Sequence, residues 1–181
     1  MLQPILIAFA AFIVLFAVIV ASRPSTFRVA RLIRITAPPS AVFLQVNDLH
    51  NFQTWSPWVK LDPGCKRTFS GPIAGAGAVF AWSGNNKVGE GRMTLTESRP
   101  TDLIRFKLEF LRPFKGNNLT EFTFKPEGPQ TVVTWTMSGQ YNFLTKAIGL
   151  FMNCEKMIGG QFEKGLAQMK SLTEAAVPEA G

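Results

Sequence analysis

An apolar run at the N-terminus places the strongest constraint on how this 181-residue chain can fold. Every residue from Ile5 to Ala21 is apolar, and no charged side chain occurs between Met1 and Ser22. At about 1.5 Å per residue, a helix over this run is about 30 Å long, which matches the hydrocarbon core of a bilayer. The run therefore predicts a transmembrane anchor over residues 1–22, and the rest of the chain has to form the folded domain.

A cleaved secretory signal is the alternative interpretation of this run. Such a signal carries a basic segment before its apolar part and a small-x-small cleavage site after it. This chain begins Met-Leu-Gln-Pro and leaves the run through Val-Ile-Val-Ala-Ser-Arg-Pro. These flanks favour an uncleaved anchor.

Basic residues follow the apolar run, and none precedes it. The net charge of +7 alone suggests nucleic acid, an anionic membrane or an acidic ligand as partner. Four of the 19 basic residues, Arg23, Arg28, Arg31 and Arg34, come directly after the run, which leaves about +3 for the remaining chain. Because the sequence contains no further basic block and no nucleic-acid-binding motif, we expect no nucleic-acid partner. The positive-inside tendency predicts that the C-terminal domain is cytoplasmic.

The first part of the domain is predicted to form a strand followed by short helices. Phe27 to Ile35 predicts a strand, and its arginines fit the outward face as well as a position beside anionic headgroups. Prolines then lead into a predicted helix from Ser40 to Asp48. An aromatic stretch from His50 to Trp58 follows, and Pro57 interrupts it.

Residues 65–139 follow a period of two, with turn formers at regular intervals, which predicts a meander of about six antiparallel strands. The clearest case is the stretch from Leu103 to Leu111, in which apolar and charged residues alternate. From Phe143 to Ala175 the spacing becomes helical and predicts one long amphipathic helix, followed by a frayed tail over residues 176–181. The apolar stripe of this helix is Leu144, Ala147, Ile148, Phe151, Ile158, Phe162, Leu166 and Met169.

The order of elements predicts an α+β domain over residues 23–175, in which a curved antiparallel sheet wraps around a long C-terminal helix. At this level the chain resembles the START-like superfamily, also called SRPBCC or the polyketide cyclase/dehydrase and lipid-transport group, and within it the small membrane-anchored bacterial members. The motifs that carry the resemblance are Ile35-Thr-Ala-Pro-Pro-Ser-Ala-Val-Phe43, Trp55-Ser-Pro-Trp58, Trp82-x-Gly84-Asn, Phe110-Leu-x-Pro113-Phe114, Val133-Thr-Trp135 and Phe162-Glu-x-Gly165-Leu. The resemblance implies a helix-grip fold and a cavity for a lipid or another hydrophobic molecule. The anchor and the arginines after it predict a location in a bacterial inner membrane.

A curved sheet is not filled completely by one helix, so inward aromatic residues should line a cavity of a few hundred Å³ as well as forming a core. The predicted ligand-binding residues are Trp55, Trp58, Phe80, Trp82, Met93, Phe106, Leu108, Phe110, Phe122, Phe124, Trp135, Met137, Phe151, Glu155, Ile158 and Phe162. The alternative for most of the aromatic residues, taken singly, is a packed core.

Glu155 stands out because a helical wheel places it near the middle of the apolar stripe. A buried carboxylate without a partner costs several kcal/mol. We therefore expect Glu155 to pair with a basic residue, to meet the polar end of a ligand, or to lie at the cavity mouth. A rotated or kinked helix that exposes Glu155 is the other interpretation.

Residues with catalytic or metal-binding chemistry are scarce. His50 is the only histidine, and Cys65 and Cys154 are far apart, so we expect two reduced thiols, no metal site and no cofactor. Asp48 and His50 fit a local turn or cap better than acid–base catalysis. Glycines between Gly71 and Gly77 suggest a strand connection, since a phosphate-binding loop requires a helix after it.

The sequence thus predicts a membrane-anchored binding module for a hydrophobic small molecule or lipid, with no catalytic residue assigned. Two alternatives stay open. The first is an enzyme similar to polyketide cyclases or dehydratases, which would use Asp48, His50 or Glu155. The second is a chaperone or complex-assembly factor that uses the sheet surface for protein contacts.

Overall fold

The computed structural model describes residues 2–151 and 153–176, which form seven strands and six helical segments. The helices are α1 (Leu2–Ser22), α2 (Pro39–Asn47), α3 (Leu49–Trp55), the 3₁₀ helix η1 (Pro57–Leu61), α4 (Phe143–Ile148) and α5 (Cys154–Ala176). The strands are β1 (Thr26–Ile35), β2 (Lys66–Ser70), β3 (Val79–Ser83), β4 (Glu90–Arg99), β5 (Leu103–Arg112), β6 (Gly116–Glu127) and β7 (Gln130–Gln140).

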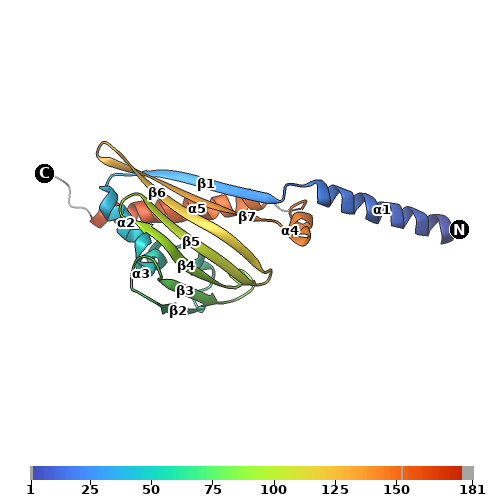
Figure 1. The fold of residues 1–181 in the computed structure, drawn as a ribbon, viewed down its shortest axis with the longest axis horizontal. Helices are drawn as coiled ribbons and strands as arrows, with labels where there is room; N and C mark the ends of the chain where they lie inside the picture. Colours follow the sequence, from blue (N-terminus) through green and yellow to red (C-terminus); the bar gives the residue numbers. More distant parts are fainter. Residues whose placement is uncertain (1, 152, 177–181) are drawn as a thin grey trace.

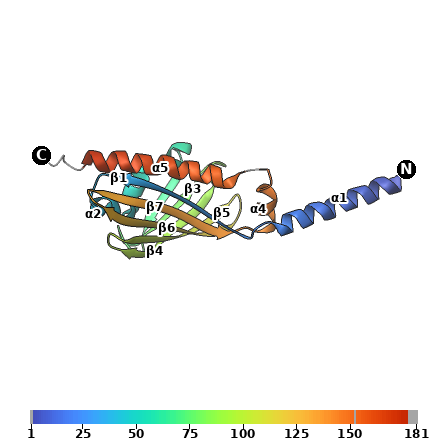
Figure 2. The same cartoon turned by 90° about the horizontal axis from the view of Figure 1, so that it is seen from above.

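All seven strands belong to one antiparallel sheet in the order β1-β7-β6-β5-β4-β3-β2. The meander predicted from the alternating pattern is therefore confirmed as β2–β7, and β1 closes the far edge by pairing with β7. The sheet curves, and α5 lies along its concave face beside β1 and β7 (Figures 1 and 2). This is the predicted α+β helix-grip arrangement.

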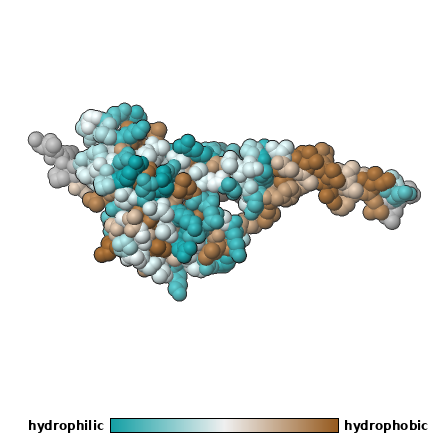
Figure 3. Space-filling model, viewed as in Figure 1, coloured by the Kyte–Doolittle hydropathy of each residue, from teal (hydrophilic) through white to brown (hydrophobic). Residues whose placement is uncertain are grey.

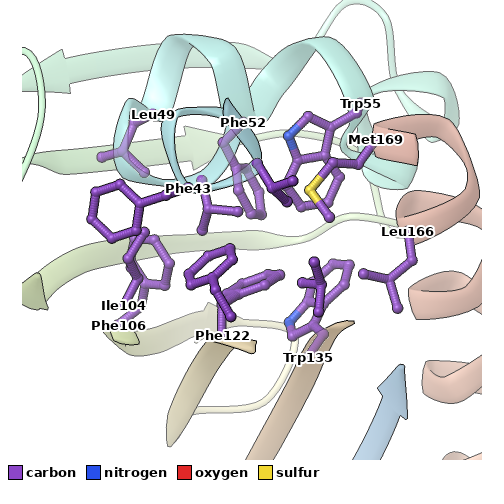
Figure 4. Close-up of a cluster of buried hydrophobic side chains, with 14 of the residues drawn as sticks. Phe43, Leu49, Phe52, Trp55, Ile104, Phe106, Phe122, Trp135, Leu166 and Met169 are labelled. Atoms are coloured by element: carbon purple, nitrogen blue, oxygen red, sulfur yellow. The ribbon is translucent and has the colours of Figure 1, made fainter. Parts of the chain in front are cut away.

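Apolar side chains from the concave face of the sheet meet α2, α3 and α5 in one core. Figure 4 shows Phe106, Phe122 and Trp135 of the sheet opposite Phe52 and Trp55 of α3 and Leu166 and Met169 of α5. Burial of several such side chains, each worth roughly 1.5–3 kcal/mol, is what holds α5 against the sheet.

α1 extends away from the domain (Figure 1). Residues Gln3–Ser22 are long and apolar enough to cross a membrane, and only 6% of this helix is buried, although a signal sequence passes the same test. Figure 3 shows hydrophobic surface along α1 up to the end of the domain that it joins. Near its C-terminal end, Val20 is fully buried, at the place where α1 contacts α4.

The prediction of a single C-terminal helix from Phe143 to Ala175 is wrong in its first third, because the structure divides this segment into α4 and α5. Each helix has its own start signal. The side chain of Asn142 accepts a hydrogen bond from the N–H of Thr145 (2.8 Å), and that of Asn153 accepts one from the N–H of Lys156 (2.9 Å). Two capping asparagines eleven residues apart therefore begin two helices where the apolar spacing alone indicates one.

Candidate functional site

The register of the strands places most of the predicted site residues on one face of the sheet. Met93 of β4 lies between Phe80 of β3 and Leu108 of β5, and Phe122 of β6 pairs with Trp135 of β7. Since residues that pair directly point to the same side of a sheet, the alternating positions form one continuous apolar surface. This surface is the concave face that α5 covers.

One part of the concave face is sealed, and we call it the deep zone. Its predicted residues are Trp55, Phe80, Met93, Phe106, Phe122, Phe124, Trp135, Met137 and Phe162, all of them buried. The rings of Trp135 and Phe162 stack with centroids 3.9 Å apart and planes 7° apart. Gly165 permits this close approach, because a Cβ at that position would lie 3.0 Å from both Trp135 and Pro57. The deep zone is therefore packed as a core.

A second part of the concave face is only half covered, and we call it the open zone. Its residues are Trp58, Trp82, Leu108, Phe110 and Ile158, all of which are partly exposed. Ile158 comes from the N-terminal part of α5, and Trp82 and Phe110 meet edge to face with centroids 5.8 Å apart. The helix thus leaves apolar, inward-facing side chains in contact with solvent.

Trp82 is held in place within the open zone. Its indole Nε1 donates a hydrogen bond to the carbonyl of Val88 (3.0 Å), and its ring lies directly over Gly91 of the neighbouring strand. A Cβ at Gly91 would come within 2.5 Å of the Trp82 ring, so only glycine admits the indole there. The hydrogen bond and the close packing on Gly91 therefore define the position of the Trp82 indole in the open zone.

Trp135 brings an unused hydrogen-bond donor into the deep zone. The ring is 2% exposed, and among the described residues its Nε1 has no acceptor. An unsatisfied buried donor costs about 1–3 kcal/mol. A ligand oxygen or a water molecule at this nitrogen would recover that cost.

Glu155 is exposed and lies beside Arg31 of the edge strand β1. Its carboxylate is 55% exposed and accepts a hydrogen bond from Arg31 Nη2 at 2.8 Å, while Glu163 accepts one from Arg31 Nε at 2.6 Å. The two carboxylates raise the pKa of Arg31. The structure thus shows two of the outcomes considered from the sequence: Glu155 pairs with a basic residue, and it is exposed near the start of a helix that is interrupted before it.

The arginine in this contact overturns part of the prediction for the first strand. Arg31 was expected on the outward face, but it pairs with Trp135 across the sheet and therefore points to the concave side. It can do so because β1 is an edge strand and α5 presents Gly159 there, with no side chain to displace the guanidinium. Arg31 consequently joins the helix to the sheet edge.

Phe151 also departs from the prediction. It lies between α4 and α5 with 81% of its surface exposed, and it does not line the concave face. The helical wheel placed it inward only because it assumed one uninterrupted helix. Leu144 of α4 is likewise 52% exposed.

Asp48 and His50 have the local role that their position suggested. The Asp48 carboxylate accepts a hydrogen bond from the N–H of His50 at 2.7 Å and caps α3. It also lies 3.2 Å from His50 Nδ1, and the imidazole stacks on Phe69 with centroids 4.1 Å apart. The segment from Gly71 to Gly77 connects β2 to β3, as expected.

Two hollows are present in the part of the chain that the structure describes, and Trp82 is the one predicted site residue that lines either of them. One of about 370 Å³ is on the outer face of strands β2–β5, and one of about 610 Å³ is a groove between η1 and α5. The groove is lined by Lys60 and Lys164 among other polar residues. The cavity of a few hundred Å³ expected between the sheet and the helix corresponds to neither of them.

Polar positions on the concave face were missed from the sequence. Asn118 and Thr120 pair with Leu108 and Phe106 and therefore share their face. Extending the alternation of Phe122 and Phe124 backwards along the strand would have found them. Arg67 was missed in the same way, since it is in phase with Phe69 on β2.

Solved structures show the same fold in distant proteins. Protein MLL2253 from Mesorhizobium loti is 14% identical, with a TM-score of 0.62 over 83% of this chain and 99% of that one. TTHA0849 from Thermus thermophilus is 19% identical, with a TM-score of 0.59 over 83% and 99%. The ginseng major latex-like protein 151 from Panax ginseng is 10% identical, with a TM-score of 0.58 over the same shares. No curated protein shows a significant sequence match to the chain.

The match at the level of a family is more direct. The sequence profile described as polyketide cyclase / dehydrase and lipid transport covers residues 26–174, which is the whole sheet with its helices and excludes α1. The matched residues thus include the concave apolar face and the helix α5 that covers it. The chain therefore belongs to the polyketide cyclase / dehydrase and lipid transport family, within the START-like superfamily.

Proposed function

We propose that this protein is a membrane-anchored binding module that holds a lipid or another hydrophobic small molecule between the sheet and α5. The observation that carries the proposal is the open zone, where five apolar residues stay partly exposed beside the core. Exposed apolar surface costs about 25 cal/mol per Å², so a ligand that covers it binds favourably. The family, which includes lipid-transport proteins by description, agrees with this use of the fold.

The shape of the site favours an elongated ligand with one polar end. Trp82, Leu108 and Phe110 offer an apolar wall, whereas Asn118 and Thr120 bring polar groups to the same face one strand away. Trp135, whose ring lies 5.6 Å from that of Trp58, adds an Nε1 donor that has no acceptor among the described residues. A ligand with a hydrocarbon tail and an oxygen-containing head group matches both the apolar wall and the polar groups.

The anchor in this proposal is α1, and the domain lies on the cytoplasmic face of a bacterial inner membrane. A bilayer-spanning helix followed by Arg23 and Arg28 supports this orientation, since basic residues are retained on the cytoplasmic side. Anchoring also raises the local concentration of membrane-derived ligands around the domain.

Native mass spectrometry of the full chain, released from detergent micelles, tests the proposal. We expect a fraction of the protein to carry a bound lipid. Leu108→Trp should fill the open zone and lower the lipid-bound fraction at least about tenfold, which corresponds to roughly 1.4 kcal/mol of binding free energy.

A matched control is available on the neighbouring strand. Leu119 pairs with Lys107 and is therefore on the outer face, where it is 37% exposed. Leu119→Trp makes the same change in volume and should leave the bound fraction unaltered. Equal losses in the two variants, or a parent protein without any bound lipid, would contradict the proposal.

A further inference from the structure

An apolar surface that the proposed function does not use lies next to the end of α1. It belongs to residues 143–151, which comprise α4 and the turn after it, and we call it the α4 segment. Phe143, Leu144 and Phe151 are 55%, 52% and 81% exposed. Three large apolar side chains exposed so close together in sequence mark an interaction site rather than ordinary surface.

The α4 segment is fixed beside the anchor. Val20 of α1 is fully buried where α1 contacts α4. Lys146 of α4 donates a hydrogen bond to the Ser25 hydroxyl at 2.9 Å, and the N–H of Tyr141 donates to the carbonyl of Ser25 at 2.8 Å. Both views of the fold show α4 at the junction between α1 and the domain (Figures 1 and 2). The segment is therefore held at the level where α1 ends.

The charges around the α4 segment suit an anionic bilayer surface. Residues 141–153 contain no acidic side chain, and Lys146 is the only charged residue among them. Arg23 follows α1 directly, and Lys156 is exposed in the first turn of α5 beside Glu155, whose carboxylate is paired with Arg31. Apolar side chains flanked by basic ones are the pattern of segments that lie in a membrane interface.

We propose that the α4 segment inserts Phe143, Leu144 and Phe151 into the headgroup and acyl boundary of the same bilayer that α1 crosses. This inference rests on the proposed anchoring by α1. The bilayer is preferred over a second protein as occupant because the segment is continuous with the spanning helix and carries basic flanks. The contact gives the domain a second attachment point and fixes its orientation.

The fixed orientation places the membrane at a particular end of the fold. β1 begins at this end and β7 finishes there, since Thr26 pairs with Gln140. α5 begins at Cys154, shortly after the α4 segment, and the first turns of α5 carry Ile158 of the open zone. The α4 segment therefore holds the open zone toward the bilayer. A lipid can then pass from the bilayer into the open zone without crossing water.

Spin labels on the full chain in vesicles of phosphatidylcholine and phosphatidylglycerol test the inference. In a background with Cys65→Ser and Cys154→Ser, single cysteines at positions 144 and 151 carry the label. Position 73 is the matched control, since Ile73 is a large apolar residue that is 74% exposed in the β2–β3 connection. Position 13 in α1 reports on the anchor separately. We expect the ratio of oxygen to nickel-chelate accessibility at 144 and 151 to exceed that at 73 at least about fivefold.

The four positions distinguish the possible failures. If position 13 lies in lipid while positions 144 and 151 behave like position 73, the α4 inference is overturned and the anchor stands. If position 13 is also in water, both are overturned. Dipolar broadening between labels at position 151 of two copies, without oxygen accessibility, would assign the surface to a dimer and overturn the bilayer contact.

A second measurement avoids replacing the cysteines. A photoreactive benzoylphenylalanine at position 151 should crosslink to phospholipid in the same vesicles, whereas the same group at position 73 should not. Crosslinking at both positions to equal extents, or at neither, would contradict the inference.

Discussion

Arg31 of β1 lies directly over Gly159 of α5, between Glu155 one turn before it and Glu163 one turn after it. A Cβ on residue 159 would stand 2.5 Å from Arg31 Cζ. The missing side chain thus makes room for a guanidinium that two carboxylates hold. This contact fixes the rotation of α5 about its own axis, and with it the set of residues that face the sheet.

Two neighbouring glycines of α5 give a direct test of this contact. Replacing glycine by alanine inside a helix stabilises it by up to about 1 kcal/mol. A Cβ at Gly160 meets nothing within 4 Å, so Gly160→Ala should show this gain. Gly159→Ala should be less stable than Gly160→Ala, because its Cβ displaces the Arg31 guanidinium from two ion pairs. Urea unfolding followed by tryptophan fluorescence measures both, since all four tryptophans lie outside α1.

An Arg31→Ala background serves as the control for that comparison. Without the guanidinium, Gly159→Ala should gain as much stability as Gly160→Ala. If Gly159→Ala is still less stable than Gly160→Ala in this background, a group other than Arg31 crowds the added Cβ.

Glu155→Gln should change the free energy of unfolding by less than about 1 kcal/mol, because the carboxylate is more than half exposed and shares Arg31 with Glu163. The fraction of lipid-bound protein in native mass spectrometry should stay the same. A clear loss of bound lipid at unchanged stability would place Glu155 in contact with the ligand, against the orientation seen here.

Phe106→Ala distinguishes the deep zone from the open zone. Phe106 is fully buried, so removing its ring should cost about 3–5 kcal/mol. Leu108 lies two residues along the same strand and is partly exposed. Leu108→Ala should therefore lower the free energy of unfolding by no more than about 2 kcal/mol. Similar costs at the two positions, measured by urea unfolding, would mean that the two zones are not distinct.

Stability should fall at acidic pH partly through Glu174. The N–H of Thr36 donates to its carboxylate at 2.6 Å, and this bond together with Lys170 holds the pKa of Glu174 below its ordinary value of 4.5. A lowered pKa in the folded state stabilises the fold above the unfolded pKa, and this contribution is lost as the pH falls through the folded pKa. Glu174→Gln should therefore be less stable than the parent at neutral pH, and the difference should shrink below about pH 4.5. A difference that is independent of pH would contradict this origin.

Orientation in the membrane can be measured with reporters fused after Gly181. A reporter active only in the cytoplasm should give signal, and one active only in the periplasm should not. Replacing Arg23, Arg28, Arg31 and Arg34 by neutral residues should weaken this bias by degrees. A strong periplasmic signal would show that the domain is exported. A mature N-terminus near Ser22 would show that α1 is cleaved.

The fold could be predicted from the sequence because its strands obey a strict alternation. Ile104, Phe106 and Leu108 alternate with charged residues, and the structure places them on the concave face as expected. The division between α4 and α5 could not be predicted from apolar spacing, since that spacing continues across the break. The signals present were the capping residues Asn142 and Asn153, which a periodicity argument does not weigh.

The site was predicted less completely, and for a physical reason. Period-two alternation tells which residues face inward but not how far a helix covers them, so Phe106 and Leu108 look equivalent in sequence. Their difference depends on the curvature of the sheet and on where α5 begins. The inward direction of Arg31 could not be predicted from alternation either. It depends on the position of β1 at the sheet edge and on the space that Gly159 of α5 leaves there.

Only Arg23, Pro24 and Ser25 separate the end of α1 from the start of β1. A link of three residues spans at most about 10–14 Å even when fully extended. Under the proposed anchoring by α1, a domain on such a tether cannot travel between membranes with its ligand, as a diffusing carrier does. The proposed function therefore implies a stationary binding site, and whatever receives the ligand has to come to this membrane.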